Sequence, residues 1–256
     1  MNASTNAKDL FARFRRPAAR PLSMVTAYDA TFAAIVEESG VDCILVGDSL
    51  ANTMLGMGKT AQVGMPEMLH HLTAVRRGAP ATCVVVDLPF GADATPELAA
   101  RNSALLREAG ADAVKLEGCH PERIRAIRAE GIEVVGHLGL LPQTATSLKQ
   151  VGRSDEERAR LLEEARAIEA AGCCAFVLEH IPSDLGREVT DSVTVPTIGI
   201  GAGPGCGGQV LVMHDLLGLS LRQPPFAKAR VDLRSIARRA MSDYHAEVAA
   251  RTFPPA

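Results

Sequence analysis

The chain has 256 residues, 47% of them hydrophobic, with 27 Lys and Arg side chains against 30 Asp and Glu. This length is typical of one barrel domain or of two smaller domains. A formal charge of −3, no basic run and no Trp argue against a nucleic-acid-binding protein, which concentrates positive charge on one face. Charges interrupt every apolar run before the roughly 18 residues that a membrane span needs, and the even spread of apolar residues excludes disorder.

Short apolar, β-branched runs alternate with helical patterns along the chain. The basic first segment lacks the apolar core of a secretion signal and predicts an exposed amphipathic helix over residues 7–15 of a cytoplasmic protein. Strands are expected at 22–27, 43–47, 83–87, 113–117, 132–136, 175–179, 196–201 and 209–213. Helices are expected between them at 30–39, 65–76, 95–109, 121–130, 155–171 and 183–191.

Two of these helices carry clear start and stop signals. Thr95 followed by Pro96 is typical of an N-cap with proline in the first helical position, and Gly110 is placed to end that helix. Ser154 and an acidic residue three positions later have the spacing of a capping box, and Gly172 ends the second helix.

The predicted strands are continuous apolar runs, which is typical of parallel strands covered on both faces. Eight of them with intervening helices predict an α/β protein, a single (β/α)8 TIM barrel that occupies residues 1–256. Residues 220–256, with a basic helix near 232–248, are expected to be an appendage packed on the barrel. The alternative is an open doubly wound sheet, which uses fewer strands and binds its ligand in one crevice.

Two phosphate-loop patterns fail on inspection. Gly58-Lys59-Thr60 has Thr53 where a P-loop needs its first glycine. The glycines at 203, 205 and 208 match a dinucleotide fingerprint, but an apolar, strand-like run follows them instead of a helix. The six cysteines form no C-x-x-C pair, which predicts free, buried thiols in a reducing compartment.

Polar groups end one predicted strand after another, and in a barrel these ends converge on the catalytic face. The residues are Asp29, Asp48, Asp87, Lys115, Glu117, His137, Glu179, His214 and Asp215. Each has a structural alternative, such as a turn at Asp48, a Lys115–Glu117 ion pair or a core histidine at 137. Like charges gathered in one place nevertheless lose hydration and repel, so their grouping favours a site that holds a cation.

Asp48, Asp87 and Glu117 are three hard oxygen ligands that suit Mg²⁺ or a similar ion with open positions. Such an ion can chelate a 2-oxo acid and stabilise the enolate formed when the neighbouring C–H is deprotonated. A separate, unliganded carboxylate is then needed as the base, and Glu179 is the candidate. Lys115 is expected to bind the substrate carboxylate or the developing enolate charge.

The chain also resembles the ketopantoate hydroxymethyltransferase family. The matching stretches are TAYD (26–29), LVGDSL (45–50), AVRRGAP (74–80), VDLPF (86–90), GADAVKLEG (110–118), GHLGLLPQ (136–143), EAAG (169–172), VLEHIP (177–182), and IGIGAG with GQVLVMHDLLGL within 198–219. The resemblance implies a cytosolic homo-oligomer, often a decamer. It also implies transfer of a one-carbon unit from 5,10-methylenetetrahydrofolate to 3-methyl-2-oxobutanoate, a step towards pantothenate.

The same resemblance implies roles for individual residues. It places Asp48, Asp87 and Glu117 at Mg²⁺, with Asp48 and Asp87 also in contact with the substrate. It places Ser49 and Lys115 on the oxo acid, Glu179 as proton acceptor and His137 in the pocket. Three loops, at 58–64, 91–94 and 145–153, and His180 depart from the family pattern, which leaves the oxo acid and the one-carbon donor open.

Several other functions fit the same residues. One alternative is a related enzyme that acts on another 2-oxo acid or uses free formaldehyde. Another is a C–C or C–P lyase of the phosphoenolpyruvate mutase and isocitrate lyase superfamily, which also uses a barrel with Mg²⁺ and a chelated 2-oxo acid. A metal-free aldolase would use Lys115 as a Schiff base. An inactive barrel that serves as an oligomeric scaffold is disfavoured, because every residue of the acidic set is present.

Overall fold

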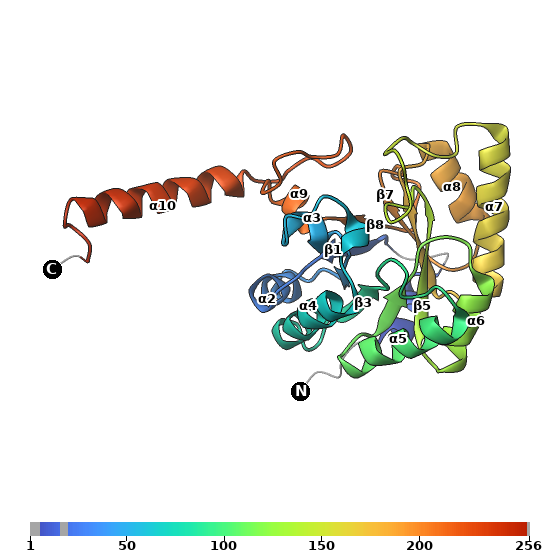
Figure 1. The fold of residues 1–256 in the computed structure, drawn as a ribbon. Coiled ribbons are helices and arrows are strands. Elements are labelled where there is room, and N and C mark those ends of the chain that lie inside the picture. The colour runs from blue at the N-terminus through green and yellow to red at the C-terminus, as the bar shows by residue number, and fades with distance from the viewer. Residues whose placement is uncertain (1–5, 16–19, 255–256) are drawn as a thin grey trace. The chain divides into compact units, whose positions relative to one another are not determined.

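The structure is a computed structural model that describes residues 6–15 and 20–254 (Figure 1). Its internal contacts divide the chain into two units, one that runs to Val210 and one that begins at Leu211. The strands and most of the helices belong to the first unit. The second unit contains the C-terminal helices.

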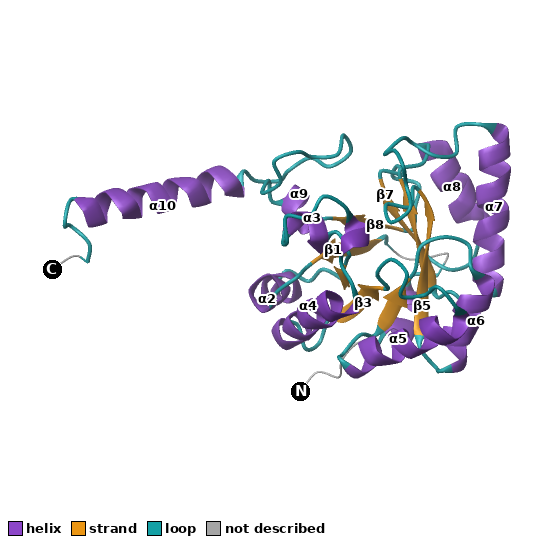
Figure 2. Ribbon diagram, viewed as in Figure 1, coloured by secondary structure: helices purple, strands orange, loops and turns teal. Residues whose placement is uncertain are grey.

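A closed barrel of parallel strands forms the first unit, in the order β1 to β8 around the ring (Figure 2). The strands are β1 (Leu22–Thr26), β2 (Cys43–Val46), β3 (Cys83–Asp87), β4 (Ala113–Lys115), β5 (Glu133–Gly139), β6 (Ala175–Glu179), β7 (Thr197–Ile200) and β8 (Gly208–Leu211), whose last residue opens the second unit. All eight predicted strands are confirmed, and closure of the ring excludes the open doubly wound sheet.

Helices cover the outside of the barrel, as the sequence pattern predicted (Figure 2). They are α2 (Ala30–Glu38), α4 (Met65–Gly78), α5 (Pro96–Glu108), α6 (Pro121–Ala129), α7 (Asp155–Ala170) and α8 (Ser183–Ser192). Thr95 caps α5, and Ser154 and Glu157 form the predicted capping box of α7. Two short elements, α3 (Leu50–Thr53) and the 3₁₀ turn η1 (Thr60–Gln62), were not predicted.

The N-terminal helix α1 (Ala7–Arg13) is amphipathic as predicted, but the expectation that it is exposed is wrong. Leu10 and Phe11 are almost fully buried, and they belong to one apolar cluster with the barrel residues Met24 and Cys43. The physical reason is the spacing of its apolar side chains, which form one stripe that covers apolar residues of the strands. Burial of a side chain of this size contributes about 1.5–3 kcal/mol.

The second unit contains α9 (Met213–Leu216) and α10 (Leu233–Ala249). The basic helix expected near 232–248 is confirmed as α10, which begins at an Asp232 cap and buries none of its residues. The predicted packing of this appendage on the barrel stays a prediction.

The six cysteines are free, and five of them are buried, which confirms that prediction. None of the helices formed by residues 6–15 and 20–254 combines the length and apolar character that a bilayer crossing requires.

The carboxylate of Asp42, directly before β2, makes the stability of the fold depend on pH. Asp42 accepts hydrogen bonds from the Arg20 guanidinium and, at 2.8 Å each, from the backbone N–H and hydroxyl of Ser23. Although partial burial opposes ionisation, these donors lower the pKa of Asp42 to about 2. Because the folded pKa lies below the unfolded value, the stabilisation is complete above about pH 4 and is lost as the pH falls towards 2.

We therefore expect Asp42→Asn to lower the free energy of unfolding by about 1 kcal/mol at pH 7, a figure discounted for the exposed Arg20. Urea unfolding at a series of pH values measures this. The wild type and the variant should converge near pH 2. A constant difference down to that pH would contradict the assignment.

Candidate active site

The carboxyl ends of β2 to β6 bring six of the predicted site residues into one network. Asp48 follows β2, Asp87 ends β3, Lys115 ends β4, and Glu117 comes two residues later. His137 lies within β5 and Glu179 ends β6. Because parallel strands end on the same face of a barrel, these side chains meet where catalytic residues of such barrels are found.

Asp48 and Asp87 lie next to each other, and the buried Lys115 pairs with Asp87. The backbone N–H of Asp48 donates to Oδ2 of Asp87 at 3.0 Å, and Nζ of Lys115 lies 3.0 Å from the other oxygen, Oδ1. Burial first, and then the neighbouring Asp87, raise the pKa of Asp48 to about 7. Burial also raises the pKa of Asp87, against the opposing effect of Lys115.

Lys115 is fully enclosed among acids. Burial alone would lower its pKa, but Asp87, Glu117 and Asp48 raise the pKa above its ordinary value. The side chain is therefore an ammonium ion at neutral pH. A Schiff-base lysine must be neutral to attack a carbonyl, so this environment disfavours the metal-free aldolase.

His137 lies between two carboxylates. Its Nδ1 is 3.5 Å from Oε1 of Glu117 and 3.3 Å from Nζ of Lys115, and its Nε2 is 3.2 Å from Oε2 of Glu179. Burial and Lys115 lower the pKa of His137, but the two carboxylates outweigh them and raise it to about 9. As an imidazolium the ring forms an ion pair with each carboxylate, although Nε2 does not meet the geometry of a hydrogen bond to Glu179.

Ser49 lies beside Asp48, and its Oγ is 2.8 Å from the hydroxyl of Tyr28. Tyr28 has no exposed surface, and burial raises the pKa of its phenol to about 12. His71 in turn lies 2.6 Å from the carbonyl oxygen of Tyr28 through Nδ1. Sequence reasoning gave no role to Tyr28 or His71, although Tyr28 belongs to the TAYD stretch.

Gln143 is a further residue of the network that sequence reasoning missed. Its backbone N–H donates to Oε2 of Glu117 at 3.1 Å, and its side-chain amide donates to Oδ2 of Asp48 at 2.8 Å. The only signal available was its place at the end of GHLGLLPQ, the stretch that follows the strand expected at 132–136.

Three of the polar residues predicted at strand ends lie outside this network. Asp29 caps α2, where its Oδ1 accepts from the backbone N–H of Phe32 at 2.9 Å. Asp29 is therefore a helix cap and does not belong to the network of acids. An acid that follows a strand is equally suited to start the next helix. His214 and Asp215 lie in α9 of the second unit.

The turn at Gly139 keeps the ends of β5 and β6 close together. Gly139 has a φ of +96°, and a Cβ atom added there would lie 2.3 Å from the carbonyl oxygen of Glu179. That oxygen accepts the backbone N–H of Leu140 at 2.9 Å. Only glycine therefore permits the close approach that sets the backbone of Glu179.

We expect Gly139→Ala to cost at least about 2 kcal/mol in stability and to lower activity, because the Glu179 backbone must move. Gly40→Ala is the matched control, since Gly40 also has a positive φ of +74° but nothing lies within 4 Å of the added Cβ. Thermal unfolding and turnover measure both effects. Equal losses in the two variants would show that backbone strain alone is responsible.

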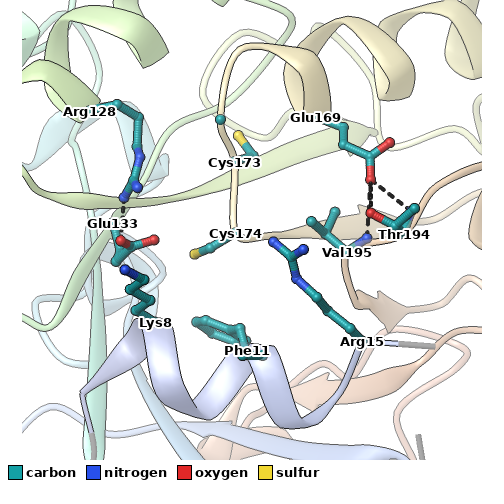
Figure 3. Close-up of a pocket in the computed structure, with 12 residues that line it drawn as sticks. Lys8, Phe11, Arg15, Arg128, Glu133, Glu169, Cys173, Cys174, Thr194 and Val195 are labelled. Carbon is teal, nitrogen blue, oxygen red and sulfur yellow. Dashed lines mark hydrogen bonds and ion pairs between the residues drawn. The ribbon is translucent and has the colours of Figure 1, made fainter. Parts of the chain in front are cut away.

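A separate cavity of about 670 Å³ lies beside α1 at the amino ends of β5 to β7 (Figure 3). Its acids are already engaged: Glu133 pairs with Arg128, and Glu169 accepts from the backbone N–H and hydroxyl of Thr194, each at 2.7 Å. This end of a barrel is associated with stability and not with catalysis. The carboxylate network at the other end is therefore the candidate active site.

The donor set of the network fits a divalent cation. Asp48, Asp87, Glu117 and Glu179 supply four carboxylates, against the ammonium of Lys115 and the imidazole of His137. Oδ1 of Asp87 is buried and pairs with Nζ of Lys115 at 3.0 Å, so this oxygen already faces a positive charge. In the described part of the chain, no group of three or more His, Cys, Asp or Glu side chains already has the arrangement of a metal site. The excess negative charge and the oxygen-only chemistry suit Mg²⁺.

The fold is a (β/α)8 barrel, and this network is its candidate active site at the carboxyl ends of the strands. The profile described as ketopantoate hydroxymethyltransferase matches residues 6–256. A Cyanothece sp. protein named 3-methyl-2-oxobutanoate hydroxymethyltransferase is 48% identical over 92% of this chain and 93% of its own length. A Deinococcus radiodurans protein of the same name is 50% identical over 91% of this chain and 86% of its own length. The chain belongs to the ketopantoate hydroxymethyltransferase family, and it is a transferase.

Solved structures of low sequence identity share the fold. Phosphoenolpyruvate phosphomutase from Streptomyces platensis subsp. rosaceus has a TM-score of 0.67 and 14% identity, over 96% of this chain and 88% of that chain. A 2,3-dimethylmalate lyase, described as a PEP mutase/isocitrate lyase superfamily member, has a TM-score of 0.64 and 18% identity. The match covers 98% of this chain and 90% of that chain. These likenesses confirm the barrel architecture.

Proposed function

We propose that this enzyme transfers a hydroxymethyl group from 5,10-methylenetetrahydrofolate to 3-methyl-2-oxobutanoate, which gives 2-dehydropantoate for pantothenate synthesis. The observation that carries the proposal is the buried network in which Asp48, Asp87 and Glu117 face Lys115 and His137, with Glu179 beside it. Family membership, and relatives that bear the name of this activity, support the same substrate.

Asp48, Asp87 and Glu117 would hold Mg²⁺. When bound, the ion withdraws electrons from the keto group of the 2-oxo acid and so acidifies its C3–H. Lys115 remains an ammonium ion in this surrounding, and it would attract the substrate carboxylate or the enolate oxygen. Asp48, Asp87 and Ser49 would contact the substrate, and Tyr28 holds the Ser49 hydroxyl in one direction.

Glu179 would act as the proton acceptor. At 19% exposure, its side chain is more open than those of Asp87 and Glu117, so it can meet a substrate. Nε2 of His137 lies 3.2 Å from one of its oxygens, an ion-pair contact when the ring is an imidazolium. The carboxylate takes the C3 proton of the oxo acid, and the resulting carbanion forms a C–C bond to the methylene carbon of the folate. This bond replaces the bond from the methylene carbon to N10. One water then supplies the hydroxyl group as the bond to N5 breaks, and the protons taken from C3 and from water go to N10 and N5 of the tetrahydrofolate that leaves.

The direct test is product formation from a panel of 2-oxo acids, with the folate donor, with free formaldehyde and with neither. We expect turnover of 3-methyl-2-oxobutanoate that requires the folate and stops with a chelator. Equal turnover with formaldehyde, or preference for another oxo acid, would replace the proposed substrates. Cleavage of an acid without any one-carbon donor would identify a lyase.

That lyase is the second candidate, because fold neighbours include members of the PEP mutase/isocitrate lyase superfamily. The loops at 58–64, 91–94 and 145–153, which follow β2, β3 and β5, differ from the family pattern. Loops of this kind set substrate choice on a fixed scaffold. The panel above separates the two candidates, since only the transferase consumes folate.

We also propose that the protein is a homo-oligomer, with a decamer as the candidate size. Helix α10 buries none of its residues, yet Met241, Tyr244 and Val248 form an exposed apolar stripe at helical spacing. An apolar stripe of this kind favours association with a second copy.

We expect Met241→Glu to shift the protein to smaller species in size-exclusion chromatography with light scattering, because a charge would be buried in the contact. Arg239→Glu, a charge change on the opposite face of the helix, is the control. An unchanged mass for Met241→Glu would contradict a contact through α10.

The cysteines support a place in the cytoplasm. All six thiols are free, including the buried neighbours Cys173 and Cys174. Unpaired thiols are typical of a reducing compartment. Fractionation of the cells that make the protein tests this proposal.

A further inference from the structure

The segment from Leu140 to Val151 connects strand ends that carry different parts of the candidate site. The backbone N–H of Leu140 donates to the carbonyl of Glu179 at 2.9 Å, and that of Val151 donates to the carbonyl of His180 at 3.1 Å. Residues 144–149 between them are exposed. Both ends of the segment are thus attached to the end of β6, where the proposed base lies.

Gln143 attaches the same segment to the acids on two other strand ends. Its backbone N–H donates to Oε2 of Glu117 at 3.1 Å. Its Nε2 donates to Oδ2 of Asp48 at 2.8 Å and to the carbonyl oxygen of Leu88 at 3.0 Å. A carboxylate and a carbonyl are both acceptors, so both amide hydrogens have partners and the orientation of the amide is determined.

These contacts fix the two carboxylates relative to each other. Gln143 occupies Oδ2 of Asp48 and Oε2 of Glu117, and thereby determines which oxygen of each acid stays available to another ligand. The amide is neutral, so it holds the acids in place without cancelling the negative charge that a cation needs. A lysine here would neutralise one acid, and a glutamate would repel both.

We propose that Gln143 is a positioning residue that sets the spacing of Asp48 and Glu117 and so determines the affinity of the site for a divalent cation. This inference rests on the proposed metal site. Groups that hydrogen-bond to ligating carboxylates typically change metal affinity by about 10–100-fold when they are removed.

The test is titration of Mn²⁺, followed by its electron paramagnetic resonance signal, into metal-free wild type, Gln143→Ala, Gln143→Asn and Gln150→Ala. Gln150 is the matched control, because it has the same side chain in the same segment and none of the hydrogen bonds that Gln143 makes to the acids. We expect about 10–100-fold weaker Mn²⁺ binding in Gln143→Ala and unchanged binding in Gln150→Ala. Both substitutions at 143 keep the backbone N–H that donates to Glu117, and Gln143→Asn also keeps an amide, although on a shorter side chain. Its affinity should therefore lie between those of Gln143→Ala and the wild type.

Melting temperature and circular dichroism accompany each titration. If the wild type takes up no Mn²⁺, the proposed metal site fails and this inference fails with it. If the wild type binds Mn²⁺ and folded Gln143→Ala binds equally well, only the role of Gln143 is overturned. If Gln143→Ala does not fold, Gln143→Asn decides, and wild-type affinity in that variant overturns the role.

Discussion

Glu179→Gln should retain cation binding and lose the exchange of the C3 hydrogen of 3-methyl-2-oxobutanoate with D₂O. The amide has the size of the carboxylate and keeps an oxygen 3.2 Å from Nε2 of His137, so the surrounding network is preserved. It cannot take up a proton at neutral pH. A positioned general base contributes about 10²–10⁴-fold, and we expect exchange and turnover to fall by at least that factor.

Exchange isolates the first step, since it needs neither the folate nor the C–C bond. Proton NMR of the oxo acid in D₂O measures its rate, with and without the folate donor. Glu117→Gln is the comparison variant: it makes the same change two residues after β4, and we expect it to weaken Mn²⁺ uptake. Wild-type exchange in folded Glu179→Gln would show that another group removes the proton.

The barrel was predictable because each strand is a short apolar, β-branched run that is buried on both faces. Strand boundaries were less accurate where that composition changes. The fifth strand, expected at 132–136, extends to Gly139, so His137 lies inside β5 and its ring projects between the acids of β4 and β6. The sequence run contains glycine and histidine at this point, and only pairing with β6 extends the strand.

The acids of the site were predictable from their position after successive strands, since topology alone brings strand ends together. The same pattern could not separate Asp29 from Asp48, because a helix cap and a site acid look alike in sequence. Gln143 was not predictable as a functional residue. Its contacts with Asp48 and Glu117 depend on the path of a loop, and no spacing rule gives that path.

Removal of the ammonium group of Lys115, which lies among the acids of the network, should have the largest effect on stability. We expect Lys115→Met to lower the free energy of unfolding by about 3–5 kcal/mol in metal-free buffer, because Asp87 would remain buried without its ion pair. For a chain of this size, the melting temperature should fall by about 6–20 °C. Methionine retains most of the side-chain volume, so the loss reflects charge and not a cavity.

The pH dependence has a definite sign. The folded pKa of Lys115 lies above its unfolded value, so its contribution is complete below about pH 10 and declines only as the pH rises through the folded pKa. The deficit of Lys115→Met should therefore be fully present at pH 7. Thermal unfolding in EDTA measures it, with Lys149→Met as the control for loss of an exposed lysine.

A double-mutant cycle separates the ion pair from other contributions of Lys115. Asp87→Asn combined with Lys115→Met removes the buried charge as well as its partner, so the double variant should be more stable than Lys115→Met alone. The coupling energy should be large because Nζ and Oδ1 are 3.0 Å apart and both side chains are almost fully buried. If the two losses simply add, Lys115 stabilises the barrel by packing, and the charge balance inferred for the site is wrong. Strong coupling would show that the ion pair itself stabilises the barrel. If Mg²⁺ also restores part of the stability of Lys115→Met, the metal ion and the ammonium group neutralise the same acids.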